Sequence, residues 1–272
     1  MRIINLIENI QGKQDILFEH GLSFFIETKE HKLLVDCGQS SAFLENAKIL
    51  GVDLKEVDSV FLSHGHYDHS GGILPFVQMN SKADIYMQKK ALLPYYHKTE
   101  QEERYIGIDP AISKLSQIKL INGDLKIDEE LTLFSNVTGR TLWPKGNLEL
   151  KKKSGDKFVQ DMFDHEQYLV ITEGNKRVLF SGCAHNGILN ILAHYFDLFC
   201  AYPDAVVSGF HMKKKDYTPE DDVLITETAN KLCTMSTQFY TGHCTGEYAF
   251  AIMKKIMGDQ LTYVHSGDEL VL

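Results

Sequence analysis

The sequence is poor in cysteine and has no two cysteines in a CxxC arrangement. Its five cysteines are scattered and odd in number: Cys37, Cys183, Cys200, Cys233 and Cys244. A disulfide framework is therefore not expected, and a reducing cytoplasm is the expected location. The N-terminal segment carries acidic residues and no sustained apolar run, so it lacks the pattern of a secretory signal.

An excess of positive charge and long apolar runs are also lacking. The chain has 28 lysines and arginines against 37 acidic residues, a formal net charge of -9. This balance argues against a nucleic-acid partner, because phosphate binding requires a basic face. No apolar stretch approaches the ~20 residues that span a bilayer, so no membrane partner is expected. The expected partner is a small-molecule substrate, and a homodimer is the default assembly because it is the commonest closed form.

What the sequence does contain is an alternation of short β-branched runs with helical patterns, without a linker or a shift in composition. We therefore expect a single domain over residues 1–272. The predicted strands are Ser23–Thr28, Lys32–Cys37, Ser59–Ser63, Ala83–Met87, Leu131–Ser135, Tyr168–Thr172, Arg177–Ser181, Ala205–Ser208 and Gln238–Thr241. The predicted helices are Ser41–Leu50, Asn186–Phe199, Pro219–Cys233 and Glu247–Met257.

A weak internal repeat relates the two halves of the chain. FFIETKEHKLLVDCG, a helix from Ser41 and VDSVFLSHGH correspond to YLVITEGNKRVLFSGC, a helix from Asn186 and PDAVVSGFHM. Each half is a hairpin, a tight turn, a helix and a buried strand that leads into a histidine. Two such halves packed sheet to sheet predict an α/β protein with a four-layer αββα sandwich. A three-layer doubly wound sheet is the competing fold.

The strongest motif is SHGHYDHSGG, residues 63–72, which directly follows the apolar run Val60-Phe61-Leu62. It places His64, His66, Asp68 and His69 within six residues, and imidazole and carboxylate are typical ligands of zinc and iron. A turn after a strand can direct the first two histidines to one metal ion and the last two residues to a second. An exposed histidine-rich loop is the alternative, but the position at the end of a buried strand favours ligands.

Here the sequence resembles the metallo-β-lactamase superfamily, whose HxHxDH signature corresponds to His64-Gly65-His66-Tyr67-Asp68-His69. The upstream structural aspartate of that superfamily resembles Asp36 in LLVDCG. More narrowly, HGHYDHSGG, GCAHNGILNIL, GFHM and TGHCTGEYA resemble the dihydropterin-ribofuranosylaminobenzene-phosphate synthase-like group. The resemblance covers the whole chain. It implies a dinuclear metal site and a phosphate-bearing, pterin-like substrate.

The sequence departs from the superfamily pattern where a bridging aspartate is usual. The strand VLFSG leads instead into Cys183, which is interpreted as a small buried residue beside the site, with a ligand role as the alternative. His185 follows before a helix and is expected to be a ligand. Of His243 in TGHCTG and His211 in SGFH, one should complete the second metal site and the other face substrate, with His243 favoured as the ligand. His165 in FDHEQY is not favoured as a ligand. The remaining histidines without a motif are interpreted as surface or core residues: His20, His31, His97, His194 and His265.

These residues predict a metal-dependent hydrolase with two divalent metal ions, zinc first and manganese or iron as alternatives. A divalent metal ion lowers the pKa of bound water towards ~7. Asp68 is expected to bind metal and to orient the nucleophile or carry its proton, and His211 to stabilise charge in the transition state. Lysines 213–215 are candidates for binding a phosphate, and the alternative is that they form a charged surface exposed to solvent. The aromatic segment 88–107 is interpreted as a lid.

Two other functions remain as alternatives on the same fold. The first is a redox protein with a di-iron site, which usually has HxExDH and an attached flavin domain. His66 stands where that glutamate would be, and the chain is too short for the extra domain. The second is a non-enzymatic metal-binding protein, and the retention of all four motif ligands argues against it.

Overall fold

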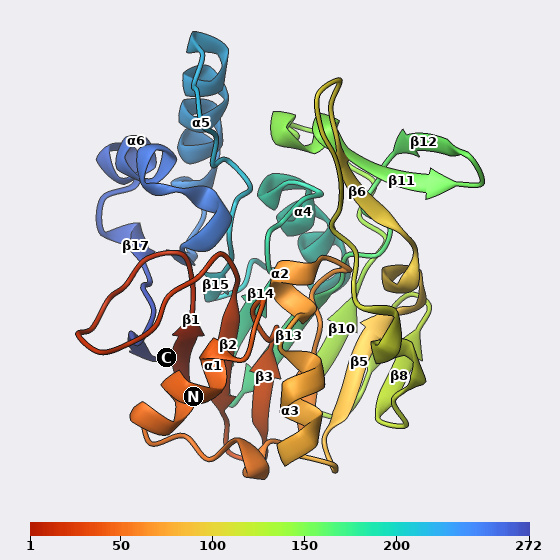
Figure 1. Ribbon diagram of the computed structural model, residues 1–272. Coiled ribbons are helices and arrows are strands. Elements are labelled where there is room, and N and C mark those ends of the chain that lie inside the picture. The colour runs from red at the N-terminus through yellow and green to blue at the C-terminus, as the bar shows by residue number, and fades with distance from the viewer.

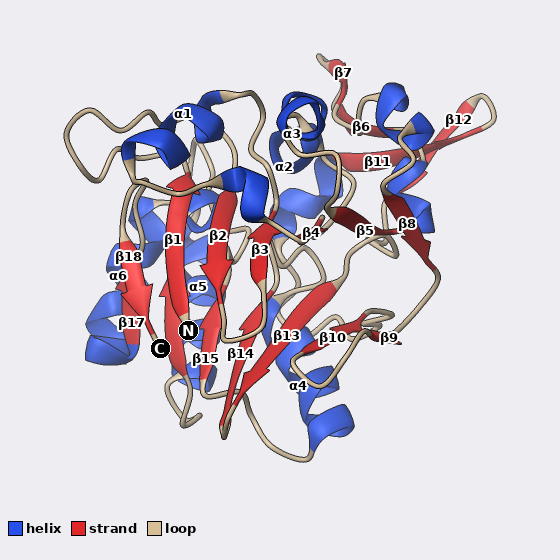
Figure 2. Cartoon of the chain, turned by 90° about the horizontal axis from the view of Figure 1, so that it is seen from below, coloured by secondary structure: helices blue, strands red, loops and turns tan.

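The computed structural model describes all 272 residues and contains two seven-stranded sheets that pack face to face (Figures 1 and 2). In spatial order the first sheet contains β18 (Glu269–Val271), β1 (Arg2–Ile7), β2 (Ser23–Glu27), β3 (Lys32–Val35), β4 (Ser59–Phe61), β5 (Asp84–Gln88) and β8 (Ile118–Ile121). The second contains β17 (Leu261–Tyr263), β16 (Gln238–Thr241), β15 (Ala205–Val207), β14 (Lys176–Phe180), β13 (Tyr168–Glu173), β10 (Leu131–Phe134) and β9 (Leu125–Lys126).

Helices cover the outer faces of both sheets, which gives four layers. Figure 2 shows α1, α2 and α3 on the side of the first sheet and α4 and α5 on the side of the second. The α-helices are α1 (Ala42–Ile49), α2 (Tyr67–Ser70), α3 (Ile73–Met79), α4 (Ile188–Phe199), α5 (Pro219–Leu232) and α6 (Glu247–Met257). The short 3-10 helices are η1 (Leu54–Glu56), η2 (Lys89–Leu92), η3 (Pro110–Lys114), η4 (Lys145–Glu149), η5 (His243–Thr245) and η6 (Gly258–Gln260).

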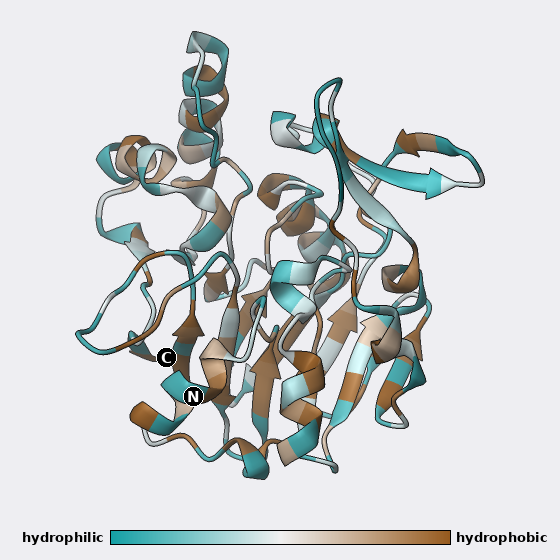
Figure 3. Cartoon of the chain, viewed as in Figure 1, coloured by the Kyte–Doolittle hydropathy of each residue, from teal (hydrophilic) through white to brown (hydrophobic).

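Alternating apolar residues explain why the strands stack in this way. Along β3, Leu33 and Val35 belong to the core between the two sheets, whereas Leu34 packs towards the helices. Along β14, Val178 and Phe180 face the same central core. Because side chains alternate between the two faces of a strand, a strand that is apolar at every position must be covered on both sides. Figure 3 shows apolar residues concentrated on these central strands.

The repeat seen in the sequence is a repeat of topology. In the first half β2 and β3 form an antiparallel hairpin, and β4 then pairs in parallel with β3. In the second half β13 and β14 form the hairpin, and β15 pairs in parallel with β14. The predicted αββα sandwich is therefore confirmed, and the competing doubly wound sheet is wrong.

A third sheet stands apart from the sandwich at one end of the molecule (Figure 1). It contains β12 (Lys157–Gln160), β11 (Leu150–Ser154), β6 (Tyr95–Lys98) and β7 (Glu103–Tyr105), so most of the segment interpreted as a lid is a β-hairpin in this sheet. The two chain ends lie together, because the Met1 amino group donates to the Leu272 carbonyl at 2.9 Å. No helix combines the length and apolar character needed to cross a bilayer.

Candidate metal centre

The turns that follow four strands bring the candidate ligands to one edge of the sandwich. His64 and His66 follow β4, His185 follows β14, His211 follows β15 and His243 follows β16. These strands run parallel to their neighbours within each sheet, so their C-terminal ends share an edge. His66 precedes α2, which carries Asp68 and His69. The edge therefore gathers all six predicted metal ligands.

Two glycines after the motif allow its close packing against the turn that follows β3. A Cβ atom on Gly71 would lie 2.1 Å from the Gln39 carbonyl oxygen, and one on Gly72 would lie 2.1 Å from the Cys37 carbonyl oxygen. No residue with a side chain fits at either position without moving backbone. The close approach holds α2 against the turn after β3 that begins at Asp36.

The first group of candidate ligands consists of His64, His66 and His185. The Nε2 atoms of His64 and His185 lie 3.3 Å apart, and the Nε2 atom of His66 is buried without a hydrogen-bond partner. Burial lowers the pKa of all three side chains, to about 3 for His66, with further lowering from neighbouring imidazoles. These histidines are thus neutral at physiological pH, which is the form that binds a metal ion.

The second group surrounds the carboxylate of Asp68. Its Oδ2 atom lies 3.4 Å from His243 Nε2 and 3.6 Å from His69 Nε2. Burial would raise the pKa of Asp68, but His69 and His243 hold it well below its usual range. Burial would lower the pKa of His69, but Asp36 and Asp68 raise it to about 9. A positive charge is therefore stabilised between these carboxylates.

Cys183 lies between the two groups. Its Sγ atom is within 4.8 Å of the ligand atoms of His64 and His185, and also of those of His69 and His243. The distance from Sγ to His69 Nε2 is 3.2 Å. This position favours the alternative in which Cys183 is a ligand over the interpretation as a small residue beside the site.

Cys244 adds a second buried thiol that the sequence interpretation did not place at the site. The ligand atoms of Cys183, His211 and Cys244 lie within 4.8 Å of one another. His211 is half-buried, its ring centroid is 4.1 Å from that of His185, and its Nδ1 atom has no hydrogen-bond partner. His211 thus lies beside the first group, whereas His243 contacts the second.

Polar side chains contact the Nδ1 atom of four of the histidines, so that the Nε2 atom of each ring faces the centre. Such outer partners set the tautomer and orientation of metal-binding histidines. The Nδ1 contacts are His64 with Ser63 Oγ at 2.9 Å, His69 with Asp36 Oδ2 at 2.6 Å, His185 with Asn147 Oδ1 at 3.0 Å and His243 with Asn9 Oδ1 at 3.0 Å.

Strained backbone is concentrated at this edge. Left-handed backbone occurs without glycine at Asp36, Ala184, His211 and His243, with φ angles of 60°, 54°, 49° and 48°. Such conformations cost of order 1–3 kcal/mol each and persist where surrounding structure imposes them. The strain here directs the side chains of both halves towards one point.

Two histidines that were not expected to be ligands also lie close to the site, His165 and His20. His165 is buried beside His66, but its Nε2 contacts Asp161 at 3.0 Å and its Nδ1 accepts from the Gly65 backbone at 2.9 Å. Both nitrogens are therefore engaged, and the residue supports the motif from outside. His20, interpreted as a surface or core residue, lies 3.3 Å from Asp68 and stacks on His243. Only the fold reveals this, because His20 has no motif around it.

The donor atoms fit divalent metal ions. The buried Nε2 atoms of His66 and His243 have no hydrogen-bond partner, which is costly unless another group satisfies them. Neutral imidazoles, a carboxylate and a thiol are the ligand types of zinc and related transition metals. The two groups would hold one ion each.

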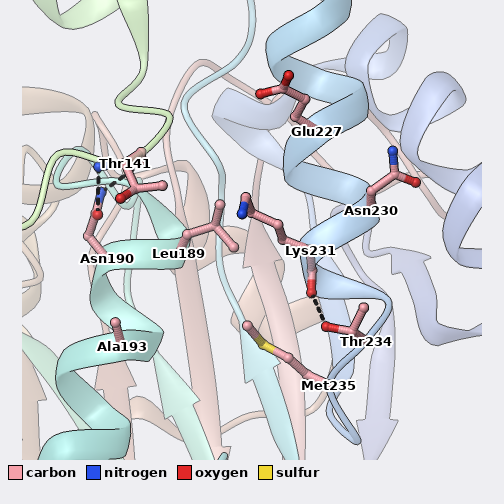
Figure 4. A pocket seen from close by; sticks show the side chains of 9 residues that line it. All are labelled: Thr141, Leu189, Asn190, Ala193, Glu227, Asn230, Lys231, Thr234 and Met235. Carbon is pink, nitrogen blue, oxygen red and sulfur yellow. Dashed lines mark hydrogen bonds between the residues drawn. The ribbon is translucent and has the colours of Figure 1, made fainter.

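The site opens into a small cavity of about 120 Å³. A larger hollow of about 570 Å³ lies between α4 and α5 (Figure 4), where Leu189 and Ala193 face Glu227 and Lys231. None of the candidate ligand groups borders that hollow. We therefore assign chemistry to the small cavity and not to the large one.

The αββα sandwich, with histidine and acidic groups at its shared edge, defines the fold of a metal-dependent hydrolase. The family model of the metallo-beta-lactamase superfamily matches residues 17–208, and the chain belongs to this superfamily. The fold family binds divalent metal ions, and most members of the superfamily are metal-dependent hydrolases.

Individual relatives cover the whole chain. One relative is a protein of Methanocaldococcus jannaschii named 7,8-dihydropterin-6-methyl-4-(beta-D-ribofuranosyl)-aminobenzene-5'-phosphate synthase. Its alignment with this chain, gaps included, is 293 residues long, with 26% identity, and it covers 98% of this chain and 95% of the relative. A crystal structure described as a metal-dependent hydrolase of the beta-lactamase superfamily has a TM-score of 0.83 and 30% identity, with 100% and 99% of the two chains covered. Zinc-bound PqqB from Methylobacterium extorquens has a TM-score of 0.60 at 13% identity, with both chains fully covered, and shows the shared fold alone.

Proposed function

We propose that this protein is a metal-dependent hydrolase of small, phosphate-bearing molecules. In this proposal one divalent metal ion is held by His64, His66 and His185, and a second by Asp68, His69 and His243, with Cys183 as a further ligand between the two groups. The observation that carries the proposal is the convergence of these buried donor atoms, two of which, His66 Nε2 and His243 Nε2, have no hydrogen-bond partner. Zinc is the proposed metal, because it accepts nitrogen, oxygen and sulfur ligands together.

The chemistry expected of such a site is hydrolysis. A bound divalent metal ion lowers the pKa of water towards ~7 and polarises the oxygen of a carbonyl or phosphoryl group. Asp68 stays ionised at physiological pH because His69 and His243 lower the pKa of its carboxyl group. Its carboxylate can therefore accept a hydrogen bond from the nucleophile and keep it oriented.

His211 has the position of a residue that faces substrate. It lines the cavity beside His185, and its Nδ1 atom lacks a protein partner. An imidazole N–H at this place can donate to an oxygen that gains negative charge during the reaction. The synthase name of the Methanocaldococcus jannaschii relative supports a pterin-like substrate, and a synthetic reaction is the closest alternative to hydrolysis.

Metal content measured by plasma mass spectrometry tests the site. The wild type is compared with His69→Ala and with the control His194→Ala, which removes a histidine of α4 outside every ligand group. About two metal ions per chain in the wild type and the control, with fewer in His69→Ala, would support the proposal. No tightly bound transition metal after reconstitution would refute it.

The reaction is tested separately with phosphate esters and a phosphate-bearing pterin. Asp68→Ala should abolish turnover while circular dichroism shows a retained fold. Full turnover in this variant would overturn the role given to Asp68.

A further inference from the structure

One wall of the cavity at the metal centre includes residues of segment 88–107, which the sequence analysis interpreted as a lid. Besides the candidate ligands, the cavity is lined by Tyr67, His97, Arg104, Ile106 and Leu150. Two of these come from β6 and β7 of the third sheet, and Leu150 begins β11. Asp68 is the only acidic residue in the lining, so a cavity lined by several histidines and one arginine lies in a protein of net charge -9.

Arg104 is the only lysine or arginine among the lining residues. Its Nη1 atom donates to the Tyr67 hydroxyl at 3.3 Å, and its Nε atom donates to Glu102 at 3.0 Å. Its Nη2 atom makes no hydrogen bond to the protein, and half of the side chain is exposed. Tyr67 lies between His66 and Asp68 in the motif, so its hydroxyl ties the guanidinium to the metal-ligand turn.

The lysines that the sequence suggested as phosphate ligands are placed elsewhere. Lys214 forms an ion pair with Asp221 at 2.6 Å, and the Lys213 side chain packs over Gly246. None of lysines 213–215 lines the cavity. The cation nearest to the candidate centre along the cavity wall is therefore Arg104.

We propose that Arg104, steadied by Tyr67, binds an oxyanion of the substrate, a phosphate or a carboxylate, at the mouth of this cavity. This inference rests on the proposed function, because it assumes that the substrate enters beside the metal ligands. A guanidinium presents its donors in a planar fork that matches such oxyanions. A cavity of about 120 Å³ suits the anionic group of a substrate, while the rest of the molecule extends outward.

The alternative is that Arg104 serves only to form an ion pair with Glu102 on the surface. The Arg104–Glu102 pair is exposed, and pairs of this kind contribute only ~0–1 kcal/mol to stability. A purely structural Arg104 could thus be replaced at little cost, and ligand binding would not change. Binding measurements therefore separate the two roles.

The test uses isothermal titration calorimetry with phenyl phosphate, benzoate and neutral benzyl alcohol. Each is titrated into wild type, Arg104→Gln, Arg104→Lys and the control Arg2→Gln, which removes an exposed arginine of β1 that pairs with Glu269. Titrations are made with metal-loaded protein and again after chelation, because metal ions also bind phosphate. Circular dichroism verifies the fold of each variant.

Arg104→Gln should weaken binding of one anion at least tenfold, about 1.4 kcal/mol, in both metal states, and leave benzyl alcohol unchanged. Arg104→Lys should lose less, because it keeps the charge without the fork. A larger effect on phenyl phosphate identifies a phosphoryl group, and a larger effect on benzoate a carboxylate. Equal anion affinities in Arg104→Gln and Arg2→Gln, or no anion binding by wild type, would overturn the inference. Arg104-dependent binding that persists without metal would stand even if the proposed hydrolytic activity failed.

Discussion

Replacement of Asn147 by alanine should lower the metal affinity. The loss should be larger than in a control variant that loses the same free energy of unfolding. Asn147 is fully buried, and its Oδ1 atom contacts His185 Nδ1 at 3.0 Å. Its amide also donates to the His185 carbonyl at 2.7 Å. The side chain therefore fixes both the ring and the backbone of a candidate ligand. Without it the imidazole is free to rotate and its Nε2 atom no longer points at the centre.

The magnitude follows from the two hydrogen bonds that are lost. Each leaves a buried group of His185 unpaired, at about 1–3 kcal/mol, so the variant should be less stable by a few kcal/mol. Loss of an outer partner of a metal-binding histidine typically costs ~10–100-fold in metal affinity. Competition with a chromophoric chelator measures the zinc affinity, and urea unfolding of the metal-free protein measures the stability.

Asn46→Ala is the matched control. Asn46 is equally buried and makes three hydrogen bonds to Leu6 and Leu17, neither of which is a candidate ligand. It should lose similar stability and keep its zinc affinity. A zinc affinity that is unchanged in Asn147→Ala, or reduced equally in Asn46→Ala, would show that the contact with His185 does not orient a ligand.

Three further results are expected. Asp36→Ala leaves His69 and Ser63 unpaired in the core and should lower the free energy of unfolding by about 3–5 kcal/mol in urea titrations; a loss below 1 kcal/mol would contradict this reading. In the metal-free protein the pKa of His69 is raised from 6.5 to about 9, so the protonated ring stabilises the folded state fully below pH 6.5, and this stabilisation is lost as the pH rises through 9. The free energy of unfolding should therefore be about 3 kcal/mol lower at pH 9 than at pH 6.5. A free energy of unfolding that rises over this range would refute the assignment. Cys183→Ser should reduce the preference for cadmium over manganese at least tenfold in competition titrations, and an unchanged preference would remove Cys183 from the ligand set.

Much of the fold was predictable because the central strands carry a strong local signal. The bounds of β16 and α6 agree with the prediction residue for residue, and β3 and β14 differ only at their ends. β3 and β14 contain apolar residues on both faces, and β16 and α6 are each followed by a glycine, so the local pattern agrees with the tertiary packing. The motif at residues 63–72 was equally clear, since four candidate ligands, three histidines and one aspartate, follow one buried strand.

The third sheet and β1 were missed for the opposite reason. β11 reads LKKKS and is largely hydrophilic (Figure 3), so no apolar alternation marks it as a strand. β1 reads RIINLI and pairs with β18 from the other end of the chain. Pairing of this kind depends on distant residues that a local pattern does not contain.

The residues of the candidate site also differ in how clearly the sequence marks them. His64, His66, Asp68 and His69 share one motif, but Asn9, His20 and Arg104 reach the site from segments with no distinctive spacing. Such residues become visible only when the chain is folded. The sequence could name candidate ligands that lie in recognisable motifs, but it could not name residues such as Asn9, His20 and Arg104 that surround them.

The division of the ligands between two halves has a consequence for the order of events during folding. His64 and His185 are 121 positions apart, and closing a loop of that length costs an unfolded chain roughly 4 kcal/mol in entropy. The short motif can capture an ion early, but the full ligand set exists only after the two sheets have docked. Tight metal binding would therefore occur only after the two sheets have packed together. The bound ion would then stabilise the folded protein and slow its unfolding.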